Sequence, residues 1–342
     1  MNRYSTKRLC LENEKDWELF NKNDKNGSFF HSLKWKKIIE ASFGYISHYF
    51  LVFDKNKVVA ICPFFEITLQ GFRGLSTLPN SDLSHIIIEE KHCNKDLVST
   101  IFDETKKITK EKKLSFIIFN NQSLETQKLF NKFKPIQNSS ATGDMLLDLK
   151  INNSKNIWHE VFSKIGKGKP RKFIKRFEKD NYKIKEVQNK KDLKDFYKYY
   201  KENLEYISAF PYPFYHFEQL YNTYKSNELR ITLLHKNNES IGGLLSFIYP
   251  PKKEMYLRYL ALKRDVPNKY HQTYYLYWDS ILKAEEMKIN TISFGSTIND
   301  QNDTRYRIKR QFGCNYRDNY SIIIPINPIF KFGYKMYNYF HK

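Results

Sequence analysis

Two stretches of the chain carry the same succession of apolar runs and polar turns. In the first, apolar runs at 49–53 and 58–65 flank a turn of Asp, Lys and Asn. In the second, apolar runs at 229–234 and 240–247 flank a turn of Lys, Asn and Glu. Short apolar runs joined by a turn rich in Asn and Asp predict a β-hairpin. We therefore expect one hairpin in each half of the chain.

An amphipathic helix that leads into a strand follows each predicted hairpin. The first helix covers 97–113 and leads into an apolar strand at 114–118. The second covers 273–288 and leads into a strand at 289–293. Corresponding segments lie roughly 180 residues apart in both cases, as an internal duplication requires. The pattern predicts two domains of one mixed α/β architecture.

The segment 151–168 is the expected connection between the two domains. It is polar at first and then enters a helix, which two glycines and Pro170 interrupt. We place the first domain at 1–150 and the second at 151–342, the latter with a basic aromatic tail at 328–342. The tail could lie on a bilayer surface, but packing against the domain is the favoured interpretation.

Candidate chemistry concentrates where the last predicted strand ends, at Phe294-Gly295-Ser296-Thr297. A strand that ends in glycine and two hydroxyl residues presents backbone N–H groups and hydroxyls, which can hold a carboxylate, carbonyl or phosphate. The segment 305–313 follows a polar loop and brings four basic residues, Arg305 and Lys309 among them. These would supply the counter-charge.

This stretch resembles the C-terminal signature of the FemAB-like acyltransferases, a branch of the GNAT acyl-transfer superfamily. That signature reads Phe-Gly-Arg-Ser, a polar loop, then Phe-Lys-x-x-Trp-Gly. Gly295 and Lys309 match it, Ser296-Thr297 stand for Arg-Ser, Ile308 stands for Phe, and Phe312-Gly313 stand for Trp-Gly. The duplicated order of elements is similar to the tandem architecture of that family. The resemblance implies two tandem GNAT domains, each a mixed central sheet flanked by helices.

The resemblance also implies an activity and roles for these residues. The activity is transfer of an acyl or aminoacyl group to a primary amine of a cell-envelope precursor, a sugar or a lipid, without a covalent enzyme intermediate. Lys309 would contact the donor or the developing oxyanion, and Arg305, Ser296 and Thr297 would position the same group. The donor would be a co-substrate (aminoacyl-tRNA, acyl-CoA or acyl carrier protein), with no tightly bound cofactor and no metal.

One absence argues against a plain acetyl-CoA donor. Acetyl-CoA-dependent GNATs carry a glycine-rich Gln/Arg-x-x-Gly-x-Gly/Ala turn whose backbone amides hold the pyrophosphate. The equivalent stretch here, 263–269, contains no glycine.

The densest basic patch lies at 166–176, where glycines precede a helix. Its side chains Arg171, Lys175 and Arg176 make a natural phosphate site together with backbone amides. The patch resembles the family segment that opens the first helix of the second domain, which implies contact with an anionic substrate or an RNA backbone. A solvated helix face is the alternative interpretation.

Three further positions are candidates. Asp82 lies in a polar loop where the family often has Pro-x-x-Asp-Tyr-Gly-Gly, and its carboxylate could accept the amine proton. A turn-capping Asp is the alternative. Tyr256 and Arg258 lie on a predicted strand and share one face if the alternation is regular. In the family that strand borders the acceptor cleft, whereas ordinary strand positions are the alternative.

Composition adds a limit on the partners and the location. The 342 residues carry a net charge of +21, which suits tRNA, nucleotide-linked sugars, acidic carrier proteins or an anionic membrane face. Compositional drift from an AT-rich genome is the competing explanation. The N-terminus lacks the apolar core of a signal peptide, and there is no run of about 18 apolar residues. We expect a cytoplasmic protein, acting at the inner membrane face if the tail binds lipid, with four free thiols.

Two other functions fit the same sequence. One is a non-catalytic basic adaptor with a GNAT-derived fold that binds RNA or an anionic envelope precursor. The other is a membrane-surface protein held by the aromatic and basic residues between Phe330 and Phe340.

Overall fold

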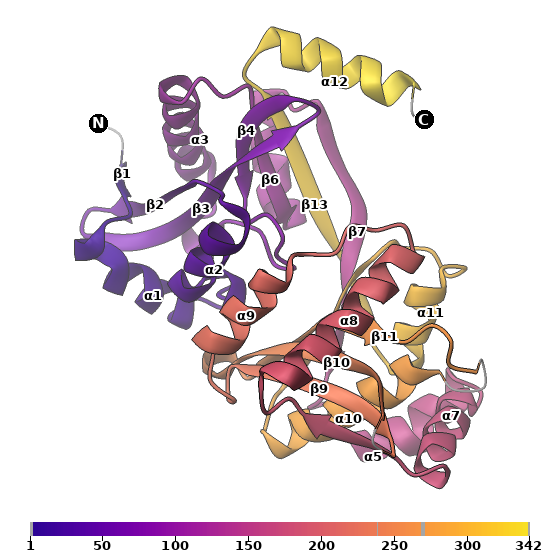
Figure 1. Cartoon of the computed structure of the whole chain (residues 1–342). Coiled ribbons are helices and arrows are strands. Elements are labelled where there is room, and N and C mark those ends of the chain that lie inside the picture. The colour runs from indigo at the N-terminus through magenta and orange to yellow at the C-terminus, as the bar shows by residue number, and fades with distance from the viewer. Residues whose placement is uncertain (1–2, 238, 268–270, 341–342) are drawn as a thin grey trace. The chain divides into compact units, whose positions relative to one another are not determined.

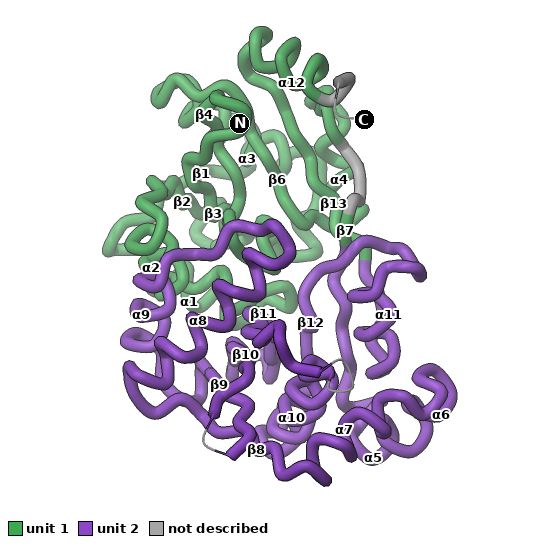
Figure 2. The backbone as a smooth tube through the Cα atoms, turned by 45° about the vertical axis from the view of Figure 1, so that its right-hand side comes forward, with its two compact units in different colours: residues 1–142, 318–342 green, residues 143–317 purple. Residues whose placement is uncertain are grey.

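The computed structural model describes residues 3–237, 239–267 and 271–340. They form two compact units, shown in Figure 2: unit 1 comprises residues 1–142 and 318–342, and unit 2 comprises residues 143–317. Both units are mixed α/β structures, as the sequence predicts.

Unit 1 is a mixed sheet with helices on both faces (Figure 1). Its strand order is β1-β2-β3-β4-β6-β13, and β5 pairs with β3. Its strands are β1 (Tyr4–Arg8), β2 (Ser47–Asp54), β3 (Lys57–Leu69), β4 (Phe72–Thr77), β5 (Ile87–Ile88), β6 (Phe116–Gln122) and most of β13 (Asn315–Pro325). Its helices are α1 (Glu14–Asn23), α2 (Leu33–Phe43), α3 (Lys95–Glu111), α4 (Leu124–Phe130) and α12 (Pro328–Phe340).

Unit 2 repeats this order of elements. Its strand order is β7-β12-β11-β10-β9-β8. Its strands are part of β7 (Gln137–Asp148), β8 (Tyr182–Glu186), β9 (Leu229–Lys236), β10 (Glu239–Tyr249), β11 (Glu254–Leu262) and β12 (Thr291–Thr297). Its helices are α5 (Ser154–Asn156), the π-helix η5 (Ile157–Val161), α6 (Phe162–Lys164), α7 (Lys169–Lys179), α8 (Lys190–Tyr206), α9 (Phe214–Thr223), α10 (Gln272–Glu286) and α11 (Thr304–Gln311).

The duplication predicted from the hydrophobic pattern is present. The hairpin β2–β3 of unit 1 begins at Ser47 and the hairpin β9–β10 of unit 2 begins at Leu229. Each hairpin leads into a third strand, a long helix and a strand that pairs parallel to the third one. The long helices are α3 and α10, whose apolar faces bury Leu97 and Ile101 in unit 1 and Leu276 and Ile281 in unit 2.

The C-terminal segment departs from the expected domain division. The expected second domain included 328–342, but residues 318–342 belong to unit 1. The reason is the pairing of β13: Ile322 and Ile324 lie opposite Phe119 and Ile117 of β6 and enter the apolar core of unit 1. Conversely, residues 143–148 of β7 pair with β12 in unit 2. Most of the last strand of the second half therefore belongs to unit 1, and the second part of the last strand of the first half belongs to unit 2.

Helices cover both faces of the unit 2 sheet (Figure 1). On one face, α7 and α10 share a core with Met255 and Leu257 of β11. On the other face, Phe217 of α9 packs on Tyr259 of β11, with ring centroids 5.3 Å apart. The break predicted around Pro170 is also present, since α7 begins at Lys169 directly after Gly168, whose φ is +74°.

Candidate functional site

The strands β11 and β12 of unit 2 are paired only at their first residues. Their parallel ladder joins Glu254–Tyr256 to Thr291–Ser293, and among the described residues the two strands form no further ladder pairs. We call the region beyond this point, bordered by Leu257–Tyr259 and Phe294–Thr297, the β11–β12 fork (Figure 2). Beyond the last ladder pair, the described parts of the two strands have facing backbone groups that do not pair with each other in the sheet. An extended ligand could hydrogen-bond to those groups as an added strand does.

A β-bulge at Arg258 shapes one side of the fork. On the neighbouring strand β10, Leu245 lies opposite Tyr259 and Ser246 lies opposite Leu257, so Arg258 is the extra residue. The bulge interrupts the alternation that was expected to place Tyr256 and Arg258 on one face. Arg258 has its guanidinium carbon 5.1 Å from the centroid of the Tyr259 ring. Arg258 therefore lies in the chain just after the two strands stop pairing, with its guanidinium group beside the Tyr259 ring.

Tyr256, the other candidate on β11, is buried rather than displayed. Its hydroxyl donates a hydrogen bond to the Glu254 carboxylate. Burial raises the pKa of Tyr256 well above its usual value, and the nearby Glu254 carboxylate adds to that shift. Its contacts favour a structural role at the start of the fork.

Buried aromatic rings and an imidazole lie behind the bulge. His216 of α9 has its Nε2 atom 3.1 Å from the Tyr259 hydroxyl, and both residues are buried. Desolvation, with a smaller contribution from Arg258, lowers the pKa of His216 to about 3. Burial also raises the pKa of Tyr200, whose ring packs edge-on against Tyr259, to about 12. The cluster is therefore uncharged near pH 7, and it fixes the position of β11 after the bulge.

The end of β12 is held by Lys309. Its Nζ atom donates hydrogen bonds to the carbonyl oxygens of Gly295 and Ser296, both at 3.1 Å, and the side chain is buried. Gly295 has a φ of +73°, and a Cβ atom there would meet only the Leu257 carbonyl oxygen, at 3.8 Å. This glycine therefore leaves its side of the fork without a side chain.

The two hydroxyl candidates on β12 differ in burial. Ser296 is exposed and Thr297 is buried. Thr297 Oγ1 has no hydrogen-bond partner within the described part of the chain. Since buried hydroxyls are normally paired, Thr297 has one unused donor and acceptor next to the fork.

Arg305 and Arg171 are both committed to local contacts. Arg305 pairs with Asp303, the N-cap of α11, at 2.9 Å, and this pairing helps to lower the Asp303 pKa to about 2. Arg171 donates to the Trp158 carbonyl at 3.0 Å and to Ser163 Oγ at 2.8 Å. The Arg171 contacts fix α7 to the preceding helical turns. The expected roles of both residues in binding substrate stay predictions.

The other two basic candidates of α7 differ in exposure and surroundings. Lys175 is exposed and Arg176 is half-buried. Phe173, on the same helix, packs its ring 4.2 Å from that of His271, the N-cap of α10. Desolvation lowers the pKa of His271, and Arg176 lowers it further. Arg176 thus contributes positive potential at the N-terminus of α10, where the helix dipole is also positive.

A second arginine acts on the same turn of α10 from α11. Arg307 partly offsets the burial that raises the pKa of Tyr274. Tyr274 also donates a hydrogen bond of 2.5 Å to Gln311 of α11. The basic residues of α7 were predicted from the sequence, but the effect of Arg307 on α10 was not. Nothing in the residue spacing shows that α7 and α11 both lie beside α10.

Unit 1 contains the counterpart of the fork, and polar side chains bridge it. Among the described residues, the parallel ladder of β4 and β6 joins only Leu75 and Ser76 of β4 to Ile117 and Ile118 of β6. Beyond that point, Asn120 Nδ2 donates to Ser76 Oγ at 2.8 Å and to the Thr77 carbonyl at 3.0 Å. The Asn120 backbone N–H donates to Thr77 Oγ1 at 2.9 Å.

Asp82, the predicted proton acceptor, lies in the loop that follows β4. It is buried, and its carbonyl oxygen accepts a hydrogen bond from Asn121. The buried His31 supports the same loop, since its Nε2 donates to the His85 carbonyl at 2.8 Å. Asp82 therefore belongs to the bridged fork of unit 1, and its role as a base stays a prediction.

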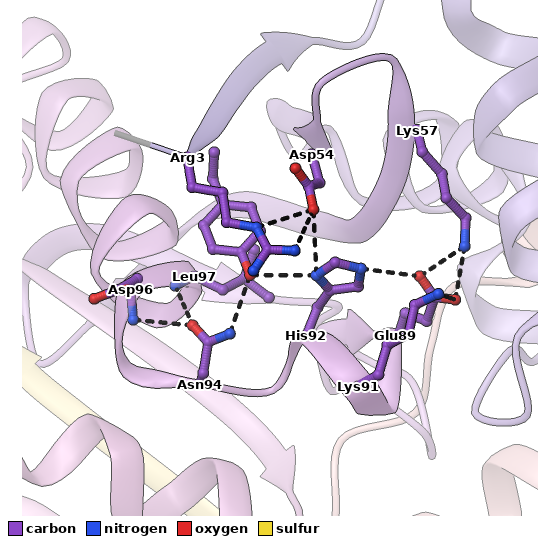
Figure 3. Close-up of polar contacts among 10 residues, drawn as sticks. Arg3, Asp54, Lys57, Glu89, Lys91, His92, Asn94, Asp96 and Leu97 are labelled. Carbon is purple, nitrogen blue, oxygen red and sulfur yellow. Dashed lines mark hydrogen bonds and ion pairs between the residues drawn. The ribbon is translucent and has the colours of Figure 1, made fainter. Parts of the chain in front are cut away.

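A separate group of charged side chains in unit 1 forms a closed network (Figure 3). Arg3 pairs with Asp54 at 2.5 Å, and Lys57 pairs with Glu89 at 2.8 Å. His92 lies between these two carboxylates, 3.9 Å from Asp54 and 3.5 Å from Glu89. Burial lowers the pKa of His92. The network joins β1, the β2–β3 turn and the segment around His92, and we interpret it as a structural tie.

The described ranges contain no group of three or more His, Cys, Asp or Glu side chains that could hold a metal ion. The four cysteines are free thiols. Within the same ranges, no helix is both long enough and apolar enough to cross a membrane.

Comparison with solved structures identifies the fold. The crystal structure of FemX matches 96% of this chain and 99% of its own length, with a TM-score of 0.72 and 13% sequence identity. A tandem GNAT protein from the clavulanic acid biosynthesis pathway matches 95% of this chain and 99% of its own, with a TM-score of 0.62 and 7% identity. The fold is therefore the tandem-GNAT fold, as the resemblance in the sequence implies.

A third match is the C-terminal domain of a putative lysylphosphatidylglycerol synthetase from Agrobacterium fabrum, with a TM-score of 0.60 and 10% identity over 91% of this chain and 92% of that domain. No protein-family model and no curated protein matches the sequence. At these identities the likeness establishes the fold and not the substrate.

Proposed function

We propose that the chain is an acyl- or aminoacyltransferase that acts on a primary amine of an envelope precursor, sugar or lipid, at the β11–β12 fork. The observation that carries this proposal is the fork itself. It joins an unfinished ladder, a bulge with Arg258 and a glycine that leaves space at the strand end. The likeness in fold to FemX and to a lysylphosphatidylglycerol synthetase domain supports the same class of activity.

The fork suits a reaction in which positioning and charge stabilisation do most of the work. The donor would extend along the unpaired backbone of β11 and place its carbonyl near Arg258. The acceptor amine attacks that carbonyl carbon, and the tetrahedral intermediate carries an oxyanion, which a nearby cation and backbone N–H groups stabilise. The carbon–sulfur or carbon–oxygen bond to the carrier then breaks, the carrier takes up a proton, and an amide remains.

Lys309 has a positioning role in this proposal. Two of the three N–H donors of its ammonium group are used on the carbonyls of Gly295 and Ser296. Those contacts keep the end of β12 in place beside Arg258. Direct contact with the oxyanion, which the family resemblance implies, remains the competing role.

The donor would carry phosphate groups. Arg176 and Arg307 both act electrostatically on the first turn of α10, and Lys175 is exposed on α7. Arginine, lysine and a helix N-terminus together favour an anionic group. Aminoacyl-tRNA, acyl-CoA and acyl carrier protein all meet this requirement.

The proposal is tested by offering the three donor classes, each radiolabelled on the transferred group, with amino sugars, amino lipids and envelope precursors as acceptors. We expect one donor class to yield a labelled amide. Arg258→Ala should lower turnover about 100-fold or more, and Arg258→Lys should restore part of it. The matched control is Lys201→Ala, which removes an exposed cation of α8 whose partner is Glu205. Full turnover in Arg258→Ala, or RNA binding without any transfer, would refute the enzyme and favour the adaptor.

Lys309→Met separates the two roles of Lys309. A positioning role predicts that the melting temperature falls and that KM and kcat both change, because the carbonyls of Gly295 and Ser296 lose their donor. A direct contact with the oxyanion predicts a kcat loss of about 100-fold to 1000-fold with an unchanged melting temperature.

A further inference from the structure

The C-terminal helix α12 (Pro328–Phe340) has apolar side chains on two opposite sides. Its inner side packs on unit 1: the ring of Phe330 lies 4.5 Å from Phe116 and 5.5 Å from Phe72, between centroids. Tyr334 is one turn further along, buried, and bonded through its hydroxyl to Gln137. These contacts anchor the helix, so its other side is free to serve a second purpose.

The outer side of α12 exposes a row of large apolar side chains. Ile329 is 68% exposed, Phe332 is 69% exposed and Met336 is 40% exposed. Their spacing of three and four residues places them on one side of the helix. Isolated exposed apolar residues are ordinary, but a row of them on one short helix indicates an interaction surface. We call Ile329, Phe332 and Met336 the outer row of α12.

The charged side chains of α12 are all positive. Lys331 and Lys335 are exposed. They alternate with the outer row in the sequence and lie beside it on the helix. The helix contains no Asp or Glu, and the whole chain carries a net charge of +21. A partner that covers this side must therefore accept apolar side chains and also carry negative charge.

We propose that the outer row of α12 docks on the surface of an anionic lipid bilayer. Ile329, Phe332 and Met336 enter the boundary between headgroups and acyl chains, while Lys331 and Lys335 contact lipid phosphates. A helix with apolar residues on one side and lysines beside them binds bilayers in this orientation. A helix that lies in the interface in this way holds a protein peripherally and reversibly. The tail identified in the sequence thus has two separate roles, since Phe330 faces the core and Phe332 faces outward.

Docking of this kind does not depend on the proposed enzymatic activity. It requires neither donor nor acceptor, so it can be measured on the purified full-length chain alone. If the activity also holds, the attachment would raise the local concentration of a lipid-linked acceptor. Failure of one proposal leaves the other standing.

Vesicle flotation tests the docking. The vesicles are pure phosphatidylcholine or an equimolar mixture of phosphatidylcholine and phosphatidylglycerol. We expect the chain to float with the anionic vesicles, and less so as salt is added. The double variant Ile329→Ser/Phe332→Ser should lower the bound fraction about tenfold or more, because it removes the apolar contacts. Lys331→Gln/Lys335→Gln should lower it about tenfold on anionic vesicles only.

The matched control removes two exposed apolar residues elsewhere, Leu11→Ser/Ile151→Ser. It should float as the unmodified chain does, and melting curves should show that all variants are folded. No flotation of the unmodified chain, or equal flotation of Ile329→Ser/Phe332→Ser, would overturn the proposal. Sedimentation equilibrium adds a further check. A dimer that dissociates in that double variant would assign the outer row to a second copy of the chain instead.

Discussion

The forks of the two units are built from the same order of elements and differ in what lies where the ladder stops. In unit 1, Asn120 bridges β6 to β4 with three hydrogen bonds, and Asn121 reaches the following loop. In unit 2, the end of β12 carries Phe294 and Gly295. Phe294 is buried in the core, and Gly295 has no side chain. The duplicated strand end is thus bridged in one unit and left unbridged in the other.

The third strand differs between the units in the same sense. In unit 2, β11 has a bulge at Arg258, within the stretch that is not paired with β12. In unit 1, the corresponding strand β4 ends at Thr77, whose hydroxyl and carbonyl both accept hydrogen bonds from Asn120. In unit 1, Asn120, Ser76 and Thr77 bond to one another and complete the fold. In unit 2, Arg258 lies in a stretch that could bind a ligand. This comparison favours unit 2 as the catalytic half.

Placing the unit 1 residue in the fork of unit 2 should have the largest effect on activity. Both forks use a left-handed residue where the strand bulges, Asn121 with φ 52° and Gly295 with φ +73°. Asn tolerates this conformation better than other residues with a side chain. Gly295→Asn should therefore keep the melting temperature within a few degrees, yet place an amide in the fork. We expect turnover to fall about 100-fold, measured by transfer of the labelled acyl group.

The reciprocal change is its control. Asn121→Gly removes the contact to the Asp82 carbonyl in unit 1 and should leave turnover within about twofold, because the proposed reaction takes place at the β11–β12 fork. A larger loss would support the predicted role of Asp82 as the base. Equal losses in Gly295→Asn and Asn121→Gly would show that the two forks do not differ in function. An active Gly295→Asn enzyme would move the site away from the β11–β12 fork.

The sequence predicted the parts of the molecule that depend on local pattern. The hairpins, the helices α3 and α10, the break before α7 and the duplication all follow from the spacing of apolar residues and from glycine and proline. Two features could not be predicted in this way. The bulge at Arg258 changes the alternation by one residue without a local signal. The exchange of β7 and β13 depends on which distant strand each one meets.

The candidate residues show the same difference between local sequence motifs and contacts that join distant residues. Lys309 and Gly295 were found because they belong to a compact motif, and the structure brings them together at 3.1 Å. His216 and Tyr259 were missed, because their contact joins residues 43 positions apart. Comparing the two strand ends could have supplied a signal, since Asn120-Asn121 and Phe294-Gly295 follow equivalent strands.

The two forks share a buried histidine that should make the protein sensitive to acid. Each is supported by a buried, uncharged imidazole, His31 in unit 1 and His216 in unit 2. Desolvation is the main cause that lowers the pKa of both, to about 3 in His216. Because the unfolded chain has a pKa of about 6.5 at these positions, it binds protons in preference to the folded chain below that pH. The free energy of unfolding therefore falls as the pH decreases from about 6.5 toward 3.

The size of that effect can be measured with one variant in each unit. Between pH 7 and pH 5, the His216 imidazole should cost about 2 kcal/mol of stability, and the His31 imidazole should act in the same direction. His216→Gln and His31→Gln should be less stable than the unmodified chain at pH 7. On acidification His216→Gln should lose about 2 kcal/mol less than the unmodified chain, and His31→Gln should also lose less, measured by urea unfolding at the two pH values. Loss of the same amount in all three proteins would show that neither imidazole is the source of the acid sensitivity.

Variants of Asn120 and Thr77 test the hydrogen bonds that bridge the fork of unit 1, and their expected effect on stability is small. Asn120→Ala removes the side-chain hydrogen bonds to Ser76 and Thr77 and should lower the free energy of unfolding by about 1 kcal/mol. Thr77→Val removes the acceptor of the Asn120 backbone N–H at nearly constant volume and should have a similar cost. Turnover should be unchanged in both, because these residues complete the fold of unit 1. A loss of turnover without a loss of stability would instead place the unit 1 fork in the reaction, and the difference between the two units would then lie in which substrate each one binds.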